Sequence, residues 1–143
     1  MKYEFGGAQW LAALHGILCE RAAQVAKIDP EVQLSMCEIY TGAPVHLAPG
    51  AEGRICWGAR IKGANVEFLH EQIADASFTV TGDWEAMLPM IRYDTCGDPE
   101  RIKEMTSMNH VLMITGKLKV TGRRDPRGKA FPSVHDAIAR LTD

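Results

Sequence analysis

Apolar residues recur at spacings of three and four over residues 9–27, which predicts an amphipathic helix. Trp10, Leu14 and Leu18 are among the apolar positions, and charged or polar residues such as Glu20 and Arg21 occupy the opposite face. The segment is followed by Lys-Ile-Asp-Pro. The residue before a proline is pushed away from the helical conformation, so the helix is expected to end there.

The pattern then changes to a period of two, which is typical of strands. Apolar and polar residues alternate over residues 32–40, 55–62 and 76–81, and a shorter alternation at 66–68 suggests another strand. The turn-rich segment after the first of these strands contains a short candidate strand at 45–47. Such alternation predicts a sheet with one apolar, covered face and one wet face.

Helical signals return after residue 82. Asp83 is predicted to cap a short helix over residues 84–91, which Pro89 should kink or end. Asp98 followed by Pro99 predicts the start of a second helix. A last strand is expected within residues 116–122.

A final helix is expected to begin at a capping box formed by Ser133 and Asp136, with Asp136 as a charge on a solvated helix face. Runs of strands followed by runs of helices favour an α+β fold with helices on one face of the sheet. We find no repeat and no linker, so residues 1–143 are predicted to form a single domain.

Composition is that of an ordinary globular protein. The 143 residues are 46% hydrophobic and 24% charged, with a formal net charge of −2, so no global basic field exists to hold nucleic acid or an anionic membrane. The four cysteines form no C-x-x-C pair, which indicates reduced thiols rather than a zinc site or a disulfide framework. No apolar run suits a signal peptide or membrane span, so we expect a cytoplasmic protein.

No motif of a known catalytic class occurs. The chain lacks a G-x-S-x-G elbow, a phosphate-binding loop, a G-x-G-x-x-G turn and an H-E-x-x-H zinc helix. The histidines are scattered and never four residues apart: His15, His46, His70, His110 and His135. We therefore predict no enzyme activity, no cofactor and no metal.

The segment from Met105 to Gly122 holds three of the seven methionines. A Cu(I) site is one interpretation, since thioethers select soft metals. However, Met105 and Met108 share an apolar helical stripe with Leu112, which favours packing or the wall of an adaptable cavity.

A short basic segment follows the last predicted strand, at residues 123–129. It is interpreted either as a solvated turn or as a mouth that meets an anionic head group, because arginine forks suit carboxylate and phosphate oxygens. The head-group candidates are Arg123, Arg124, Arg127 and Lys129.

The order of motifs resembles the sterol carrier protein 2 (SCP-2-like) family. The resemblance rests on "IADASFTVTGDWEAMLPMI", on "GKLKVTG" and on a closing helix over "SVHDAIARL". Two departures are evident. The end "RLTD" is not a peroxisomal address of the Ser-Lys-Leu type, and residues 92–106 are longer than the family usually has there.

The resemblance implies a five-stranded, mostly antiparallel sheet with helices on one face, enclosing an apolar tunnel for lipids, fatty acids, acyl-CoA or sterols. It implies no catalytic residues. Combined with the apolar stripes, it gives a predicted ligand cavity lined by Trp84, Met87, Leu88, Ile91, Met105, Met108, Leu112, Ile138 and Leu141.

The function predicted in this way is non-catalytic binding and transfer of hydrophobic small molecules, with no nucleic acid and no stable membrane insertion. A filled core made of the same residues is the alternative, because periodicity shows which side faces inward and not whether a void remains there. In that case the protein would be an accessory or dimerising domain that docks on a partner enzyme or, as a homodimer, on its own copy. An enzyme using Tyr93, Asp94 or His110 near the cavity mouth is a third hypothesis.

Overall fold

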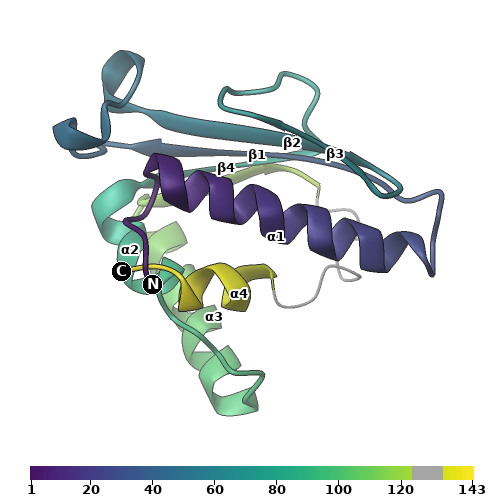
Figure 1. The fold of residues 1–143 in the computed structure, drawn as a ribbon. Coiled ribbons are helices and arrows are strands. Elements are labelled where there is room, and N and C mark those ends of the chain that lie inside the picture. Colours follow the sequence, from purple (N-terminus) through teal and green to yellow (C-terminus); the bar gives the residue numbers. More distant parts are fainter. Residues whose placement is uncertain (124–133) are drawn as a thin grey trace.

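The first apolar period forms helix α1 (Ala8–Ala26), as predicted. Its inward face is buried against the sheet through Trp10, Leu11, Leu14, Leu18, Ala22 and Val25. Figure 1 shows α1 lying across one face of the sheet, with the other helices on the same side. The chain leaves the helix just before Asp29 and Pro30 and turns into the first strand.

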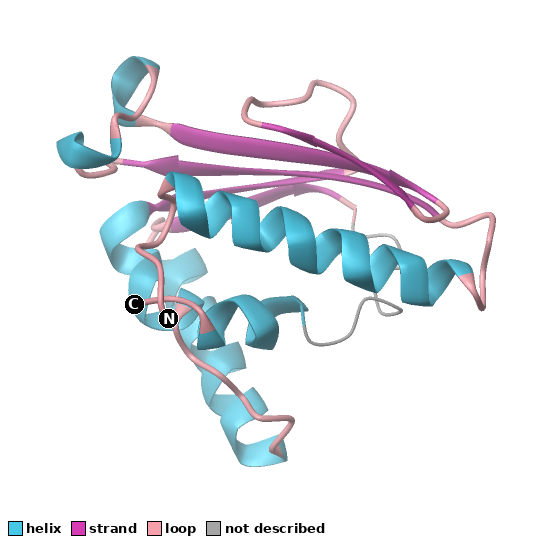
Figure 2. Ribbon diagram, viewed as in Figure 1, coloured by secondary structure: helices cyan, strands magenta, loops and turns pink. Residues whose placement is uncertain are grey.

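The computed structural model describes residues 1–123 and 134–143. Within them a five-stranded sheet has the order β3-β2-β1-β4-β5 (Figure 2). The strands are β1 (Gln33–Thr41), β2 (Ile55–Lys62), β3 (Asn65–Leu69), β4 (Phe78–Asp83) and β5 (Leu118–Gly122). Only the β1–β4 pair is parallel, and the other three pairs are antiparallel, so the mostly antiparallel α+β fold is confirmed.

The helix-covered face of the sheet carries the main core. Tyr40, Trp57, Ile61, Val80 and Leu118 alternate along their strands and pack with α1 in one cluster. The opposite face is only partly wet. Ile73, in the connection before β4, packs on Cys37 and Ile39 in a second small core. The expectation of one fully wet face is therefore wrong where residues 70–77 cross the sheet.

The candidate strand at 45–47 is wrong as well. Val45–Leu47 forms a short 3₁₀ helix, in which the Leu47 N–H donates to the Pro44 carbonyl at 3.1 Å. The Val45 side chain is 89% exposed, so apolar character does not mark burial here. A second 3₁₀ turn, Ala51–Gly53, completes this connection.

The helices after the sheet begin where predicted. Helix α2 (Trp84–Ile91) is capped by Asp83, whose carboxylate accepts from the Ala86 N–H at 2.9 Å. Pro89 lies inside the helix, two residues before its end at Ile91, and it has no N–H to donate to the carbonyl one turn earlier, in keeping with a helix that ends there. Helix α3 (Pro99–Ile114) is capped by Asp98, which accepts from the Arg101 N–H at 3.2 Å.

Helix α4 (Val134–Arg140) closes the chain beside α1. Ser133, the predicted first residue of its capping box, lies outside the described residues. Asp136 is buried, not solvated, and its carboxylate bonds to Thr95. The prediction of a solvated face charge is thus wrong. No helix in the described part of the chain is both long and apolar enough to cross a membrane.

Candidate functional site

Helix α2 is fixed to the rest of the molecule by aromatic contacts. The Trp84 indole N–H donates to the Phe5 carbonyl at 2.9 Å, and the two rings stack at 5.6 Å between centroids. Met87 and Ile91 are buried in the main core. The other side of the helix, which includes the exposed Pro89, faces α3.

Helix α3 is attached much less firmly. None of its side chains is fully buried. Four of its apolar side chains are largely exposed: Ile102 at 43%, Val111 at 57%, Met113 at 48% and Ile114 at 70%. Its neighbours are α2 and β5, whereas α1 packs across the sheet.

An apolar groove separates α2 from α3. Its volume is about 360 Å³, and its walls are almost entirely apolar. Ala86, Pro89 and Met90 form the α2 side, and the α3 side consists of Ser107, Met108, Val111 and Leu112. Among the described residues that line the groove, Ser107 alone has a polar side chain, so the groove suits a hydrocarbon surface rather than a charged one.

The structure places most of the predicted cavity residues in or against the main core, and two of them on the groove. Met108 and Leu112 lie on the groove. Three others, Met87, Ile91 and Ile138, are buried in the main core, and Trp84 and Leu88 pack against that core. Met105 and Leu141 are half-buried. Of the head-group candidates, Arg123 is exposed just after β5, and Arg124, Arg127 and Lys129 lie outside the described residues.

Five groove residues fall outside the cavity that periodicity predicts: Ala86, Pro89, Met90, Ser107 and Val111. The sequence pattern marks Pro89 only as a helix breaker. Met90 and Val111 stand one residue from the inward positions Ile91 and Leu112, on the flank of each stripe. The groove is formed by residues beside the inward stripe of each helix, where the two helices pack against each other. The periodicity of one helix alone does not predict which of these residues line it.

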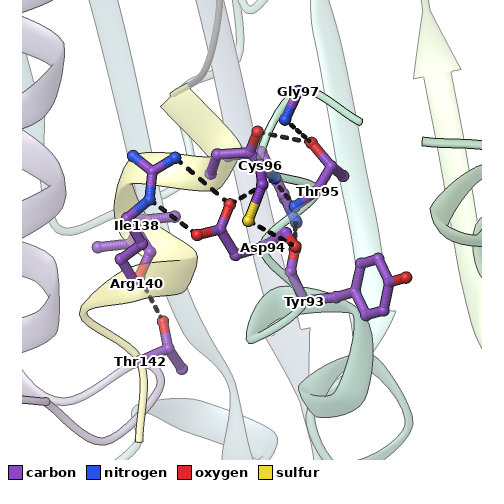
Figure 3. Close-up of polar contacts among 10 residues, drawn as sticks. Tyr93, Asp94, Thr95, Cys96, Gly97, Ile138, Arg140 and Thr142 are labelled. Carbon is purple, nitrogen blue, oxygen red and sulfur yellow. Dashed lines mark hydrogen bonds and ion pairs between the residues drawn. The ribbon is translucent and has the colours of Figure 1, made fainter. Parts of the chain in front are cut away.

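The loop between α2 and α3 is held to α4 by polar contacts (Figure 3). The Thr95 N–H and hydroxyl donate to the two carboxylate oxygens of Asp136, at 2.8 and 2.6 Å. The Arg140 guanidinium donates to Asp94 at 2.8 Å, and the His135 ring nitrogen lies 3.0 Å from the Tyr93 carbonyl. These bonds fix the start of α3 relative to the rest of the molecule.

Two groups in this loop have shifted pKa values. The Cys96 N–H, and after it Arg140, lower the pKa of Asp94 by stabilising its carboxylate. The pKa of Tyr93 is raised, chiefly because its hydroxyl donates to Glu104. Arg101 lies over the Tyr93 ring, 4.9 Å from its centroid. His110, the third candidate of the enzyme hypothesis, is exposed on α3.

A chain of polar groups crosses the main core beneath α1. The Trp57 indole N–H donates to the Tyr40 hydroxyl at 2.6 Å, and that hydroxyl donates to a Glu38 carboxylate oxygen at 2.6 Å. Burial and the Glu38 carboxylate raise the pKa of Tyr40 well above its ordinary value. The alternating pattern marks Tyr40 and Trp57 as strand residues, but it does not predict that they bond to each other or to Glu38.

No group of three His, Cys, Asp or Glu side chains within residues 1–123 and 134–143 is arranged to hold a metal ion. The methionines of α3 are spread along the helix, with Met108 on the groove and Met113 largely exposed. Their positions fit apolar contact.

No protein-family model matches the sequence, and neither does any curated protein. Solved structures do match it. One is the solution structure of "the conserved hypothetical protein TT1886, possibly sterol carrier protein" from Thermus thermophilus, with 9% identity, 100% of this chain and 94% of that chain covered, and a TM-score of 0.53.

Two further structures align over most of both chains. "Crystal structure of sterol carrier protein 2" matches with 8% identity over 96% of each chain, at a TM-score of 0.48. A "UbiJ-SCP2 Ubiquinone synthesis protein" matches with 17% identity over 89% of this chain and 88% of that chain, at a TM-score of 0.47. The similarity to the Thermus protein extends over the whole chain. The fold is therefore SCP-2-like, as the sequence motifs indicated.

Proposed function

We propose that this protein binds hydrophobic ligands without transforming them, and carries them between sites. The ligand class comprises fatty acids, acyl-CoA, phospholipids and sterol-like molecules. The observation that supports this most directly is the apolar groove between α2 and α3. The fold supports it as well, because the Thermus protein of the same fold is described as a candidate sterol carrier.

The size and the apolar surface of the groove support hydrocarbon binding. Its volume of about 360 Å³ lies within the range of roughly 300–1,000 Å³ that is usual for small-molecule sites. Met90 and Met108 face it from opposite helices. Methionine side chains are unbranched and polarizable, so such walls can repack around ligands of different outline.

The energetics favour long acyl chains. Each methylene transferred from water to the groove contributes about 0.8 kcal/mol. Association and ordering cost on the order of 4–15 kcal/mol, so only ligands with many buried methylenes bind well. Because α3 has no fully buried side chain, it can move away from α2 to enlarge the groove at a small cost in contacts.

The first experiment is native mass spectrometry of the protein purified without added lipid, before and after solvent extraction. The expected result is an added mass that extraction releases as a fatty acid, acyl ester or sterol-like molecule. A bare polypeptide that also fails to take up a panel of acyl chains would contradict the proposal. Such a result, with a concentration-dependent mass, would favour the accessory or dimerising role instead.

A series of acyl chains of increasing length tests the groove itself. Affinity should rise several-fold to about tenfold for every two added methylenes, until the groove is full. Met108→Trp should block the longer chains, because the indole would occupy the space between the helices. Met113→Trp is the matched control, since Met113 is 48% exposed on the same helix and does not line the groove. Equal binding by the two variants would exclude the groove as the ligand site.

A further inference from the structure

One polar side chain interrupts the apolar lining of the groove. Ser107 lies on α3, one turn before Val111, and both line the groove together with Met108 and Leu112. The α2 wall has no polar side chain among its described lining residues. Ser107 is exposed, so a ligand in the groove can reach its hydroxyl.

The Ser107 hydroxyl differs from the two threonine hydroxyls of the same helix. Thr106 donates to the Ile102 carbonyl at 2.9 Å, and Thr115 donates to the Val111 carbonyl at 2.8 Å. Hydroxyls inside helices often bond in this way to the carbonyl four residues earlier. Within the described part of the chain, the Ser107 hydroxyl forms neither this bond nor any other. It can therefore both donate to a ligand and accept from one.

The groove offers no counter-charge to an ionic ligand, because none of its described lining residues is charged. The charged side chains of α3 nearest to Ser107 in the sequence are Lys103 and Glu104, and both contact other groups. The Lys103 Nζ lies 3.6 Å from a Glu100 carboxylate oxygen, and Glu104 accepts from the Tyr93 hydroxyl. An anionic head group in the groove would thus lose its hydration without gaining a cation.

We propose that Ser107 binds the polar head of the ligand, and that the groove prefers lipids with a single alcohol group to lipids with an anionic head. An alcohol can accept from the Ser107 hydroxyl or donate to it. Ser107 is the first lining residue of α3 and Leu112 the last, so the hydrocarbon chain would extend from Ser107 toward Leu112 among apolar side chains. This inference rests on the proposed function and narrows its ligand class.

Two contributions set the size of the preference. A hydrogen bond between uncharged groups changes affinity by roughly twofold to tenfold. A carboxylate has to stay in water, and each methylene that it withdraws from the groove weakens binding by about fourfold. With one bond gained and one methylene retained, an alcohol should bind about tenfold more tightly than the carboxylate of equal chain length.

The test is isothermal titration calorimetry of the full chain, freed of lipid, with decanol and with decanoate at neutral pH. Decanol is expected to bind about tenfold more tightly. Ser107→Ala should weaken decanol binding by roughly twofold to tenfold and leave decanoate binding unchanged, because only the alcohol contacts the hydroxyl. Ser107→Thr keeps a hydroxyl and should keep the preference for decanol.

Thr106→Val is the matched control. Thr106 is the neighbouring residue, it does not line the groove, and its hydroxyl bonds within the helix. This variant should bind both ligands like the unchanged protein. Circular dichroism of the variants checks that each one is folded.

Equal affinity of the unchanged protein for decanol and decanoate would overturn the proposal, and so would equal losses for Ser107→Ala and Thr106→Val. Weaker binding of both ligands to Ser107→Ala would assign Ser107 a role in the shape of the wall and overturn it too. In each of these cases hydrocarbon binding itself is still observed, so the carrier function stands. Binding of neither ligand would count against the carrier function and would overturn this inference with it.

Discussion

Helices α1 and α3 are of similar length, with 19 and 16 residues, yet they are attached in opposite ways. Helix α1 buries six side chains against the sheet. Helix α3 fully buries none and leaves Val111 and Ile114 in solvent. The comparison separates two roles within the molecule. Helix α1 and the sheet form most of the buried core, while α2 and α3 enclose an apolar groove of which α3 is the less firmly attached wall.

The difference in attachment is also a difference in expected dynamics. A helix with few buried contacts opens at a lower free-energy cost than the global unfolding reaction. Helix α3 is tied down at its beginning by the contacts around Thr95 and Asp136, and at its end by the turn into β5. Between these points it contacts mainly α2, across the groove.

The largest expected difference in stability is between a leucine-to-alanine substitution in α1 and the same substitution in α3. Leu18 is 1% exposed, so Leu18→Ala should destabilise the protein by about 2–5 kcal/mol through lost burial and a residual cavity. Leu112 is half-buried between the groove and the main core, and Leu112→Ala should cost less, about 1 kcal/mol, because the space it leaves opens onto the groove. Denaturant unfolding of the two variants measures both values. Equal losses of unfolding free energy would contradict the weaker attachment of α3.

The next prediction is a loss of stability from a substitution at the junction between β4 and α2. Gly82 is buried beneath Met87, whose sulfur occupies the place that a Cβ would need. Gly82→Ala should therefore destabilise the protein by about 1–3 kcal/mol through overpacking. The control is Gly16→Ala in the middle of α1, where nothing lies within 4 Å of the added carbon. That change should stabilise by roughly 0.5–1 kcal/mol, because alanine is the better helix former.

Sequence reasoning worked best where one period continued over a whole element. The stripe that begins at Trp10 predicted α1, and the alternation around Trp57 predicted β2, because each pattern is imposed by burial against a single large partner. The caps Asp83 and Asp98 were predicted correctly for a different reason, since a cap bonds to backbone groups only three residues away.

The candidate site was predictable only in part. The stripe containing Met108 and Leu112 indicated an apolar face on α3, and both residues lie on the groove. The angle between α2 and α3 decides which flanking residues complete the groove, and that angle depends on long-range contacts. Asp136 shows the same limit, because Thr95, its partner, lies 41 residues away in the sequence.

Removing the Asp136 carboxylate should test how the beginning of α3 is held. Asp136→Ala leaves the Thr95 N–H and hydroxyl without their acceptors in a buried site, and a loss of about 1.5–3 kcal/mol is expected. Amide hydrogen exchange should accelerate in the first turns of α3 more than in α1. Uniform acceleration across both helices would contradict the view that this contact acts locally.

The smallest expected effect is a pH dependence of the stability that comes from Asp94. Its pKa is lowered in the folded protein, so its contribution to stability is present above the unfolded pKa of about 3.9 and is lost as the pH falls through the lower folded value. Asp94→Asn should therefore be less stable than the unchanged protein near neutral pH, and the difference should shrink below about pH 4. Denaturation midpoints at a series of pH values measure this. Because the carboxylate also accepts the Cys96 N–H, Arg140→Gln should reproduce only part of the effect, and a complete reproduction would assign the lowered pKa to Arg140 alone.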